Sequence, residues 1–288
     1  METKWNMKDK TPQYILDNEA DASNDWKFEE KPKKEDKRVV FTIADDNNLG
    51  FARNLEKTFK HFHPDIEFRI ICGVELKERL ELDRDFFYRA TPKIAEELFN
   101  EGYTMVLKID ADSLITGSLD YVFNTTDYDI GTVINWNRID PRIYGVVQGW
   151  GIQPPEYMNC GFVAMRSKRA VHHWRVLCET QQFYRLQYRE QDLLNIIIYY
   201  GNYNCRCFDM GDGPMGEHGW YGLIAKGEWS RAIMKDGNIV VPQGQDNFPP
   251  HEMKLNVIHW AGGQGSPKMN YRTVFTEEVA DYIDSLLK

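Results

Sequence analysis

Two aspartates that flank a small residue provide the clearest candidate for chemistry in this chain. Asp110 and Asp112 directly follow an apolar run that ends at Ile109, which predicts that they stand at the end of a buried strand. Side chains at alternate positions of an extended chain project from the same face, so the two carboxylates should converge. Converging carboxylate oxygens suit a hard divalent cation such as Mg²⁺ or Mn²⁺, which can in turn bind a diphosphate. The spacing therefore predicts a metal site for a phosphorylated ligand.

The same Asp-x-Asp pattern occurs at two other places, and only the context separates the three. Asp83-Arg84-Asp85 lies in a charged stretch, and Asp127-Tyr128-Asp129 precedes an apolar run instead of following one. Both are interpreted as surface or turn segments. For the pair at 110 and 112 the alternative is a helix cap or an Asx turn, which requires no ligand.

The elements that would position these carboxylates alternate between strand and helix. Apolar runs predict strands at 39–44, 68–72, 104–109, 130–134, 161–165 and 257–259. Apolar residues at helical spacing predict helices around 51–62, 92–99, 168–178, 190–200 and 277–286. This order predicts an α/β fold whose central sheet is mostly parallel and flanked by helices, with ligands at the carboxyl ends of the strands.

Cap residues indicate where several of the helices should begin. Ser167 and Thr276 are typical N-caps, and Thr91 followed by Pro92 predicts a third helix start. Arg89 would then lie just before a helix N-terminus, where backbone N–H groups favour a phosphate. The alternative for Arg89 is an ordinary surface arginine.

Composition limits the classes of function that remain. The chain has 288 residues, of which 42% are hydrophobic, enough for a sizeable core in one α/β domain. Its formal net charge of −9 disfavours a surface that binds nucleic acid. The longest apolar run, 193–200, is too short for a transmembrane segment, and no signal peptide or zinc-binding cysteine spacing is present. A cytoplasmic location is therefore expected.

The first 37 residues differ from the rest of the sequence. Residues 1–37 are polar and charge-rich and sustain no apolar period, which predicts an N-terminal arm or extension. The domain is then expected to span residues 38–288.

Four blocks of sequence resemble glycosyltransferase family eight, which includes glycogenin and bacterial lipopolysaccharide galactosyltransferases. They are KIDADSLI at 108–115 with LDYVF at 119–123, YMNCGF at 157–162, EQDLLN at 190–195 and HWAG at 259–262. The blocks stand in the family's order. The resemblance implies a GT-A type nucleotide-diphospho-sugar transferase fold and dependence on Mn²⁺ (or Mg²⁺). It also implies a UDP-sugar or similar donor, a saccharide or glycan acceptor, and transfer with retention.

The resemblance also implies roles for individual residues. His259 would complete a metal set with Asp110 and Asp112, although taken alone it is better explained as a core histidine bonded to the backbone. The catalytic residues that would face the transferred sugar are Asn159, Gln191 and Asp192, and capping of a helix is the alternative for Asp192. The other residues expected to bind the donor are Arg89, Asp110, Ala111, Asp112, Gly262 and Lys268. Thr42, Ala44 and Asp45 are candidates for the nucleoside because they end the first strand, and a simple turn is the alternative for them.

Two features of the late blocks depart from the family pattern. The family has Lys-Pro soon after His-x-x-Gly, but here Gly265 takes the lysine position and Pro267 precedes Lys268. Glu190 stands where aspartate is the commoner residue. The departures bear on the role of Lys268 at the diphosphate.

Aromatic residues cluster in two long segments, 135–158 and 209–222. Trp136, Trp150, Trp220 and Tyr221 are candidate platforms on which an acceptor sugar could stack. Packing in a loop or in the core is the alternative for each.

Three further functions compete with sugar transfer to a glycan. A nucleotidyltransferase would use a similar sheet and metal, but its basic, glycine-rich loop after the first strand is replaced here by Asp45-Asp46-Asn47-Asn48. A non-catalytic nucleotide-sugar-binding protein would look identical in sequence. A glycosyltransferase that modifies DNA bases is disfavoured by the acidic net charge.

Overall fold

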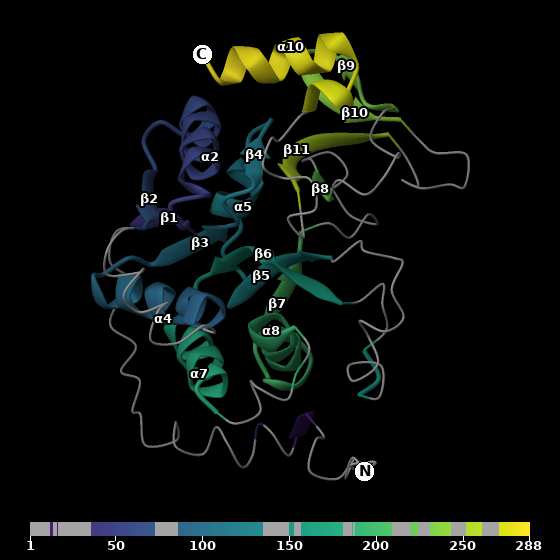
Figure 1. Ribbon diagram of the computed structural model, residues 1–288. Helices are drawn as coiled ribbons and strands as arrows, with labels where there is room; N and C mark the ends of the chain where they lie inside the picture. Colours follow the sequence, from purple (N-terminus) through teal and green to yellow (C-terminus); the bar gives the residue numbers. More distant parts are fainter. Residues whose placement is uncertain are drawn as a thin grey trace, which may run out of the picture.

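The computed structural model describes residues 12–13, 16, 36–72, 86–134, 150–152, 157–180, 186, 188–208, 220–223, 231–242, 252–260 and 271–288. Within these ranges the chain forms two β-sheets with helices packed against them (Figure 1).

The larger sheet confirms the predicted α/β class. Its strands lie in the order β2 (Glu67–Ile71), β1 (Arg38–Ile43), β3 (Met105–Ile109), β6 (Met158–Met165), β5 (Ile130–Ile134) and β7 (Cys205–Cys207). β1 is parallel to β2 and β3, and β5 is parallel to β7. β6 runs antiparallel to β3 and β5, so one reversed strand separates the two parallel parts.

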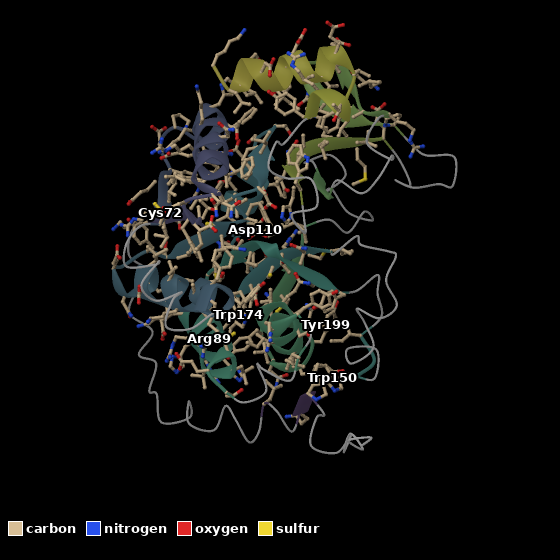
Figure 2. The ribbon with its side chains drawn as sticks, viewed as in Figure 1. Cys72, Arg89, Asp110, Trp150, Trp174 and Tyr199 are labelled. Atoms are coloured by element: carbon tan, nitrogen blue, oxygen red, sulfur yellow. The ribbon has the colours of Figure 1, made fainter. Side chains whose placement is uncertain are left out.

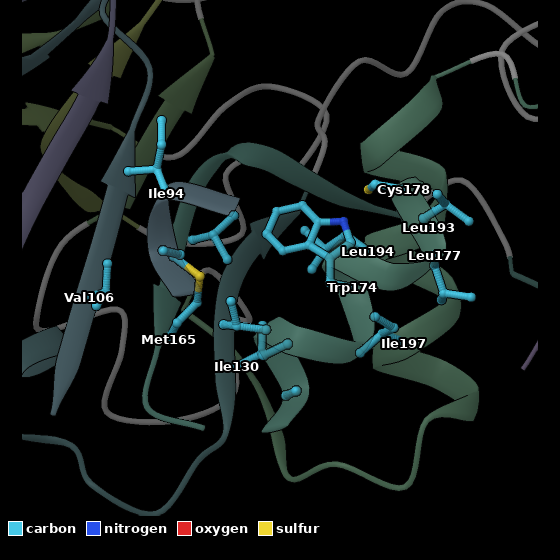
Figure 3. Close-up of a cluster of buried hydrophobic side chains, with 14 of the residues drawn as sticks. Ile94, Val106, Ile130, Met165, Trp174, Leu177, Cys178, Leu193, Leu194 and Ile197 are labelled. Atoms are coloured by element: carbon cyan, nitrogen blue, oxygen red, sulfur yellow. The ribbon is translucent and has the colours of Figure 1, made fainter. Parts of the chain in front are cut away.

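Helices cover both faces of this sheet. α2 (Leu49–Phe62) and α5 (Asp120–Asn124) bury Leu55, Phe59 and Phe123 against one face. α4 (Phe86–Asn100), α7 (Lys168–Cys178) and α8 (Arg189–Tyr200) cover the other. Figure 3 shows the fully buried ring of Trp174 inside this second cluster, next to Leu194. The central strands β1, β3, β6 and β5 are therefore buried on both faces, whereas the edge strands β2 and β7 are only partly buried.

A smaller sheet lies beside the first and carries the C-terminal helix. Its strands are β4 (Ser113–Ile115), β11 (Met253–His259), β10 (Asn238–Val241) and β9 (Ile233–Lys235), with β8 (Trp220–Leu223) also paired to β11. The short helix η7 (Tyr271–Thr273) precedes α10 (Glu277–Leu286), which packs on this sheet at the top of Figure 1. β4 follows β3 directly in the chain, so the two sheets are joined at the predicted metal site.

Two of the three predicted helix starts are confirmed. The hydroxyls of Ser167 and Thr276 accept hydrogen bonds from the N–H groups of Ala170 and Val279. The prediction that Thr91 and Pro92 begin a helix is wrong, because α4 begins at Phe86 and Pro92 lies inside it. A proline within a helix costs about 3 kcal/mol.

Burial of α4 against the sheet offsets the cost of its internal proline. Ala90, Ile94, Ala95 and Leu98 are buried on one side of this helix. These buried residues lie on both sides of Pro92 at helical spacing. Their packing against the sheet therefore outweighs the local preference of the proline and decides where the helix begins.

The sequence shortens or misses several of the observed strands. β6 begins at Met158, three residues before the predicted start, and β11 begins at Met253, four residues early. The sequence predicts none of the short strands β4, β7, β8, β9 and β10. β4, β6 and β11 depend on partner strands far away in the sequence, which a local apolar pattern does not record.

Some predictions fall outside the described residues. The segment 83–85 lies outside them, and so does most of the predicted arm at 1–37. Leu16 of that segment is buried in the cluster around Trp174. The division into an arm and a domain at residue 38 stays a prediction. Among the described helices, none has both the length and the apolar character needed to cross a membrane.

A buried histidine ties α2 to the loop that follows β4. His63 is 5% exposed, and its Nε2 accepts a hydrogen bond from the N–H of Leu119 at 2.8 Å. Because Nε2 accepts a hydrogen bond, it carries no proton, so the imidazole is neutral. Burial lowers the pKa of His63, although the carboxylate of Asp120 at 3.7 Å acts in the opposite direction. Protonation of this imidazole therefore opposes folding.

This histidine should make folding sensitive to mild acid. Its pKa is lower in the folded state than in the unfolded state, so the unfolded chain binds the proton first as the pH falls below about 6.5. His63 should thus reduce the free energy of unfolding below that pH, by at most about 1.4 kcal/mol per pH unit. Urea unfolding of wild type and His63→Gln between pH 7.5 and 5 measures the effect. The stability advantage of the wild type should shrink as the pH falls, and a constant difference would contradict the assignment.

Candidate metal and donor site

The connection between the two sheets brings three predicted metal ligands together. β3 ends at Ile109, and the next residues form a tight turn in which the N–H of Ser113 donates to the carbonyl of Asp110. β4 then pairs antiparallel with β11, and His259 lies directly opposite Ser113. The N–H of Trp260 donates to the carbonyl of Asp112 at 3.0 Å. Strand pairing thus places the imidazole beside two carboxylates that precede it by about 150 residues.

The geometry of the three side chains fits a divalent cation. His259 Nε2 lies 3.3 Å from Asp110 Oδ2 and 3.1 Å from Asp112 Oδ1. The possible ligand atoms all lie within 4.8 Å of one another. Ligands about 2.1 Å from an octahedral ion lie about 3.0 Å apart when they are adjacent, close to the observed separations. Two carboxylates and one imidazole form a donor set that Mn²⁺ accepts, and Mg²⁺ favours the two carboxylates.

The electrostatics of the site are those of a tightly coupled charge cluster. The His259 side chain is 3% exposed, whereas those of Asp110 and Asp112 are 35% and 23% exposed and can be reached by an ion. Burial alone would lower the pKa of His259, but the carboxylates of Asp112 and Asp110 raise it to about 9. Burial would raise the pKa of Asp110, yet Lys108 and His259 hold it well below its usual value. The imidazole must release its Nε2 proton before that nitrogen can bind a metal.

Gly161 on β6 allows these groups to approach. A Cβ atom there would lie 2.6 Å from His259 Cε1 and 2.7 Å from both Asn159 Oδ1 and Asp110 Oδ2. The backbone of Gly161 bonds to two of these residues. Its carbonyl accepts a hydrogen bond from the N–H of Asp110 at 2.8 Å. Its N–H donates to Asn159 Oδ1 at 2.6 Å. Asn159, predicted to face the transferred sugar, therefore lies next to the metal set, and only glycine fits beside it.

Helix α8 docks on β6 through polar side chains. Asn195 accepts a hydrogen bond from the N–H of Met158 at 2.7 Å and donates to the carbonyl of the same residue at 2.9 Å. Gln191 Oε1 accepts from the N–H of Cys160 at 3.0 Å. These contacts fix the start of α8 against the strand that carries Asn159.

Asp192 is satisfied by groups within the fold. It is 1% exposed, and its two oxygens accept hydrogen bonds from the hydroxyl of Tyr157 at 2.6 Å and from the N–H of Tyr188 at 2.8 Å. Tyr188 is the N-cap of α8, so these bonds support the helix start. A catalytic part for Gln191 and Asp192 stays a prediction.

Glu190 is a further acidic group near the site. One of its oxygens, Oε2, is buried and has no hydrogen-bond partner among the described residues. Its other oxygen lies 3.7 Å from Cys160 Sγ. Burial raises the pKa of Glu190 to about 8, so the carboxyl group is largely neutral at pH 7 and can donate a hydrogen bond.

The predicted nucleoside residues near the end of β1 are largely internal. Thr42 and Ala44 are fully buried, and Ala44 packs with Ala52 and Ala111 beneath α2. Asp45 Oδ1 accepts hydrogen bonds from the backbone and side-chain amides of Asn48 at 2.9 and 2.8 Å, which stabilise the turn between β1 and α2. Donor contacts by Thr42, Ala44, Asp45 and Ala111 stay predictions.

Two other predicted residues, Arg89 and Trp150, lie away from Asp110 in Figure 2. Arg89 lies in the first turn of α4, so the prediction that it precedes a helix N-terminus is wrong. Figure 2 shows Arg89 on the helix side of the molecule, well separated from Asp110. Trp150 packs against Ile152, Tyr157 and the helix layer, and its carbonyl accepts a hydrogen bond from the Tyr200 hydroxyl.

Several predicted site residues fall outside the described part of the chain. Gly262, Lys268 and Trp136 lie in undescribed segments. For Trp220 and Tyr221 only the backbone in β8 is described, and it runs parallel to the strand that carries His259. Their roles in binding donor or acceptor stay predictions.

Two residues of the site were not anticipated from the sequence. Lys108 stands inside the first quoted block, but its pairing with Asp110 is visible only in the folded chain. The need for glycine at position 161 arises from side chains on three separate segments. A lysine within an apolar strand run is the signal that could have marked the first of these.

Comparison with known proteins places this geometry in a known fold. No protein-family model matches the chain, and no curated protein matches it. Among solved structures it is similar to mouse xyloside xylosyltransferase 1, with a TM-score of 0.50, 11% sequence identity, and coverage of 78% of this chain and 98% of that chain. The chain has a GT-A glycosyltransferase fold. This confirms the predicted fold class.

Two other solved glycosyltransferases are similar to the chain. The galactosyltransferase LgtC, in complex with donor and acceptor sugar analogues, has a TM-score of 0.49 and 19% identity over 85% of this chain and 99% of its own. A glycosyltransferase involved in glycosylation of the major capsid of PBCV-1 has a TM-score of 0.47 and 10% identity over 87% of this chain and 98% of its own.

Proposed function

We propose that this protein is a metal-dependent glycosyltransferase that moves a hexose from a nucleotide-diphosphate sugar, a UDP-sugar, to a saccharide or glycan acceptor with retention. One observation supports this most strongly. On a GT-A fold, Asp110, Asp112 and His259 meet at the carboxyl end of a central strand, the edge of an α/β sheet where ligands bind. Two partly exposed carboxylates beside a buried imidazole suit a cation that also binds a diphosphate.

Different residues of the site would bind the metal and orient the sugar in such a reaction. Asp110, Asp112 and His259 would hold Mn²⁺ or Mg²⁺, which stabilises negative charge on a departing diphosphate. Asn159, fixed beside them by Gly161, would orient the sugar through its amide. The bond from the anomeric carbon to the phosphate oxygen breaks, and its electron pair leaves with the nucleoside diphosphate. A bond to the acceptor oxygen forms, and the acceptor hydroxyl releases its proton to the solvent.

Donor hydrolysis tests this function without knowledge of the acceptor. A panel of nucleotide sugars is incubated with the full chain in Mn²⁺ and in EDTA, and the release of nucleoside diphosphate is measured. We expect at least one UDP-sugar to be hydrolysed only when metal is present. The proposal is overturned when no donor of the panel is bound or consumed and metal has no effect.

The same assay separates the competing functions. A non-catalytic nucleotide-sugar-binding protein would bind UDP in a metal-dependent manner and release no product. This outcome is a real alternative because the oxygens of Gln191 and Asp192 are already bonded within the fold. A nucleotidyltransferase would instead release pyrophosphate from a nucleoside triphosphate and a sugar 1-phosphate.

A further inference from the structure

A buried lysine stands beside the three metal ligands. Lys108 lies near the end of β3, on the sheet face that is covered by α4, α7 and α8, next to the apolar position of Val106. Its side chain is only 7% exposed. A buried ammonium is costly unless charged and polar partners surround it, so this position must serve an interaction that an apolar residue could not provide.

The ammonium of Lys108 binds only one of the two carboxylate oxygens of Asp110. Lys108 Nζ forms an ion pair with Asp110 Oδ1 and donates a hydrogen bond to the carbonyl of Cys160 at 2.9 Å. The other oxygen, Asp110 Oδ2, lies 3.3 Å from His259 Nε2 and faces the metal set. One oxygen is thus held by the protein, and one is presented to a cation. The bond to Cys160 anchors the ammonium to β6, the strand that also carries Asn159.

We propose that Lys108 is a positioning residue that restricts Asp110 to one metal-binding oxygen and places a fixed positive charge beside the leaving diphosphate. This inference rests on the function proposed above. A carboxylate that can offer only one oxygen binds a cation less tightly than one free to offer both. A neighbouring ammonium also repels the cation directly. Lys108 therefore weakens the binding of the metal alone.

The same charge favours the anionic ligand. When a divalent cation is bound, the charges of Asp110 and Asp112 are balanced by the ion, and Lys108 leaves the site with a net positive charge. This positive charge attracts the negatively charged diphosphate, and the attraction is stronger in a buried site than in water. Lys108 should thus lower the affinity for the metal alone and raise the affinity of the metal-bound site for the nucleotide.

Removal of the charge should change the two affinities in opposite directions. Lys108→Met keeps an unbranched apolar stem, and Lys108→Gln keeps a donor for the carbonyl of Cys160. In each variant we expect Mn²⁺ alone to bind about tenfold more tightly, and UDP at saturating Mn²⁺ to bind about tenfold more weakly. Calorimetry on the full chain measures both constants, and thermal melting checks that each variant is folded. A residue that merely supports the fold would weaken both affinities together.

The controls separate this inference from the proposed function. Lys235→Met removes an exposed lysine that pairs with Glu252 on the second sheet, and it should change neither affinity. If the wild type binds neither Mn²⁺ nor UDP, the proposed function fails. If the wild type binds both, and folded Lys108 variants show weaker or unchanged Mn²⁺ binding or unaltered UDP binding, the role of Lys108 is overturned.

Discussion

Asp112→Asn should reduce metal-dependent turnover of the donor by about 10²-fold or more, equivalent to about 3 kcal/mol of transition-state stabilisation. The substitution keeps the size of the side chain but removes its charge and one anionic metal ligand. It also replaces the carboxylate that lies 3.1 Å from His259 Nε2 with an uncharged amide. Turnover across a Mn²⁺ titration and calorimetric Mn²⁺ affinity should both fall. The fold should persist, because the contact to Trp260 uses the carbonyl of residue 112.

The chain supplies a matched control in another Asp-x-Asp segment. The side chain of Asp127 is 74% exposed and pairs with Arg206 at 3.2 Å, so Asp127→Asn makes the same chemical change at the surface. This variant should retain the metal affinity and turnover of the wild type. Equal behaviour of the Asp112 and Asp127 variants would show that the metal assignment is wrong.

Gly161→Ala should lower Mn²⁺ affinity about 10–100-fold, although it adds only a methyl group and removes no ligand. The new Cβ would lie within 2.7 Å of atoms in Asn159, Asp110 and His259, well inside contact distance. Since His259 and Asn159 are buried, they have little room to retreat, and the ligand set must open. Overpacking of this kind also costs about 1–3 kcal/mol of folding stability. Calorimetric Mn²⁺ affinity and urea unfolding measure the two effects separately.

Two other glycines distinguish damage to the site from loss of stability. Gly131→Ala places its Cβ 2.4 Å from the ring of Phe208, so it should destabilise the fold but leave Mn²⁺ affinity intact. Gly50→Ala meets nothing within 4 Å and lies in α2, so it should leave metal binding unchanged and stabilise the helix by about 0.5–1 kcal/mol. If metal affinity followed stability across all three variants, the close contact at Gly161 would not explain the effect.

Much of the α/β layer could be predicted from local pattern. β5 was predicted with its observed limits, and α7 and α10 begin after the serine and threonine caps that the sequence indicates. Local pattern succeeds at these places because a cap hydrogen bond or an apolar run acts within a few residues. It fails at α4, where burial of Ile94 and Leu98 overrides the preference of Pro92 for a helix start.

The site was only partly accessible from the sequence. The carboxylate pair was predicted from its place after an apolar strand, but His259 was joined to it only through the resemblance. Its proximity depends on β4, a strand that is too short to leave a pattern of its own. The contacts of Lys108 are equally hidden, because they require the orientation of Asp110 and a carbonyl of a neighbouring antiparallel strand.

The antiparallel pairing of β4 with β11 has a consequence for how the chain can vary. His259 faces the carboxylates because it sits opposite Ser113, and neighbouring positions on a strand point to opposite faces. An insertion or deletion of a single residue within β11 would turn the imidazole away and present an apolar or indole group instead. Such a protein could keep the same architecture and yet lose its capacity to hold an ion.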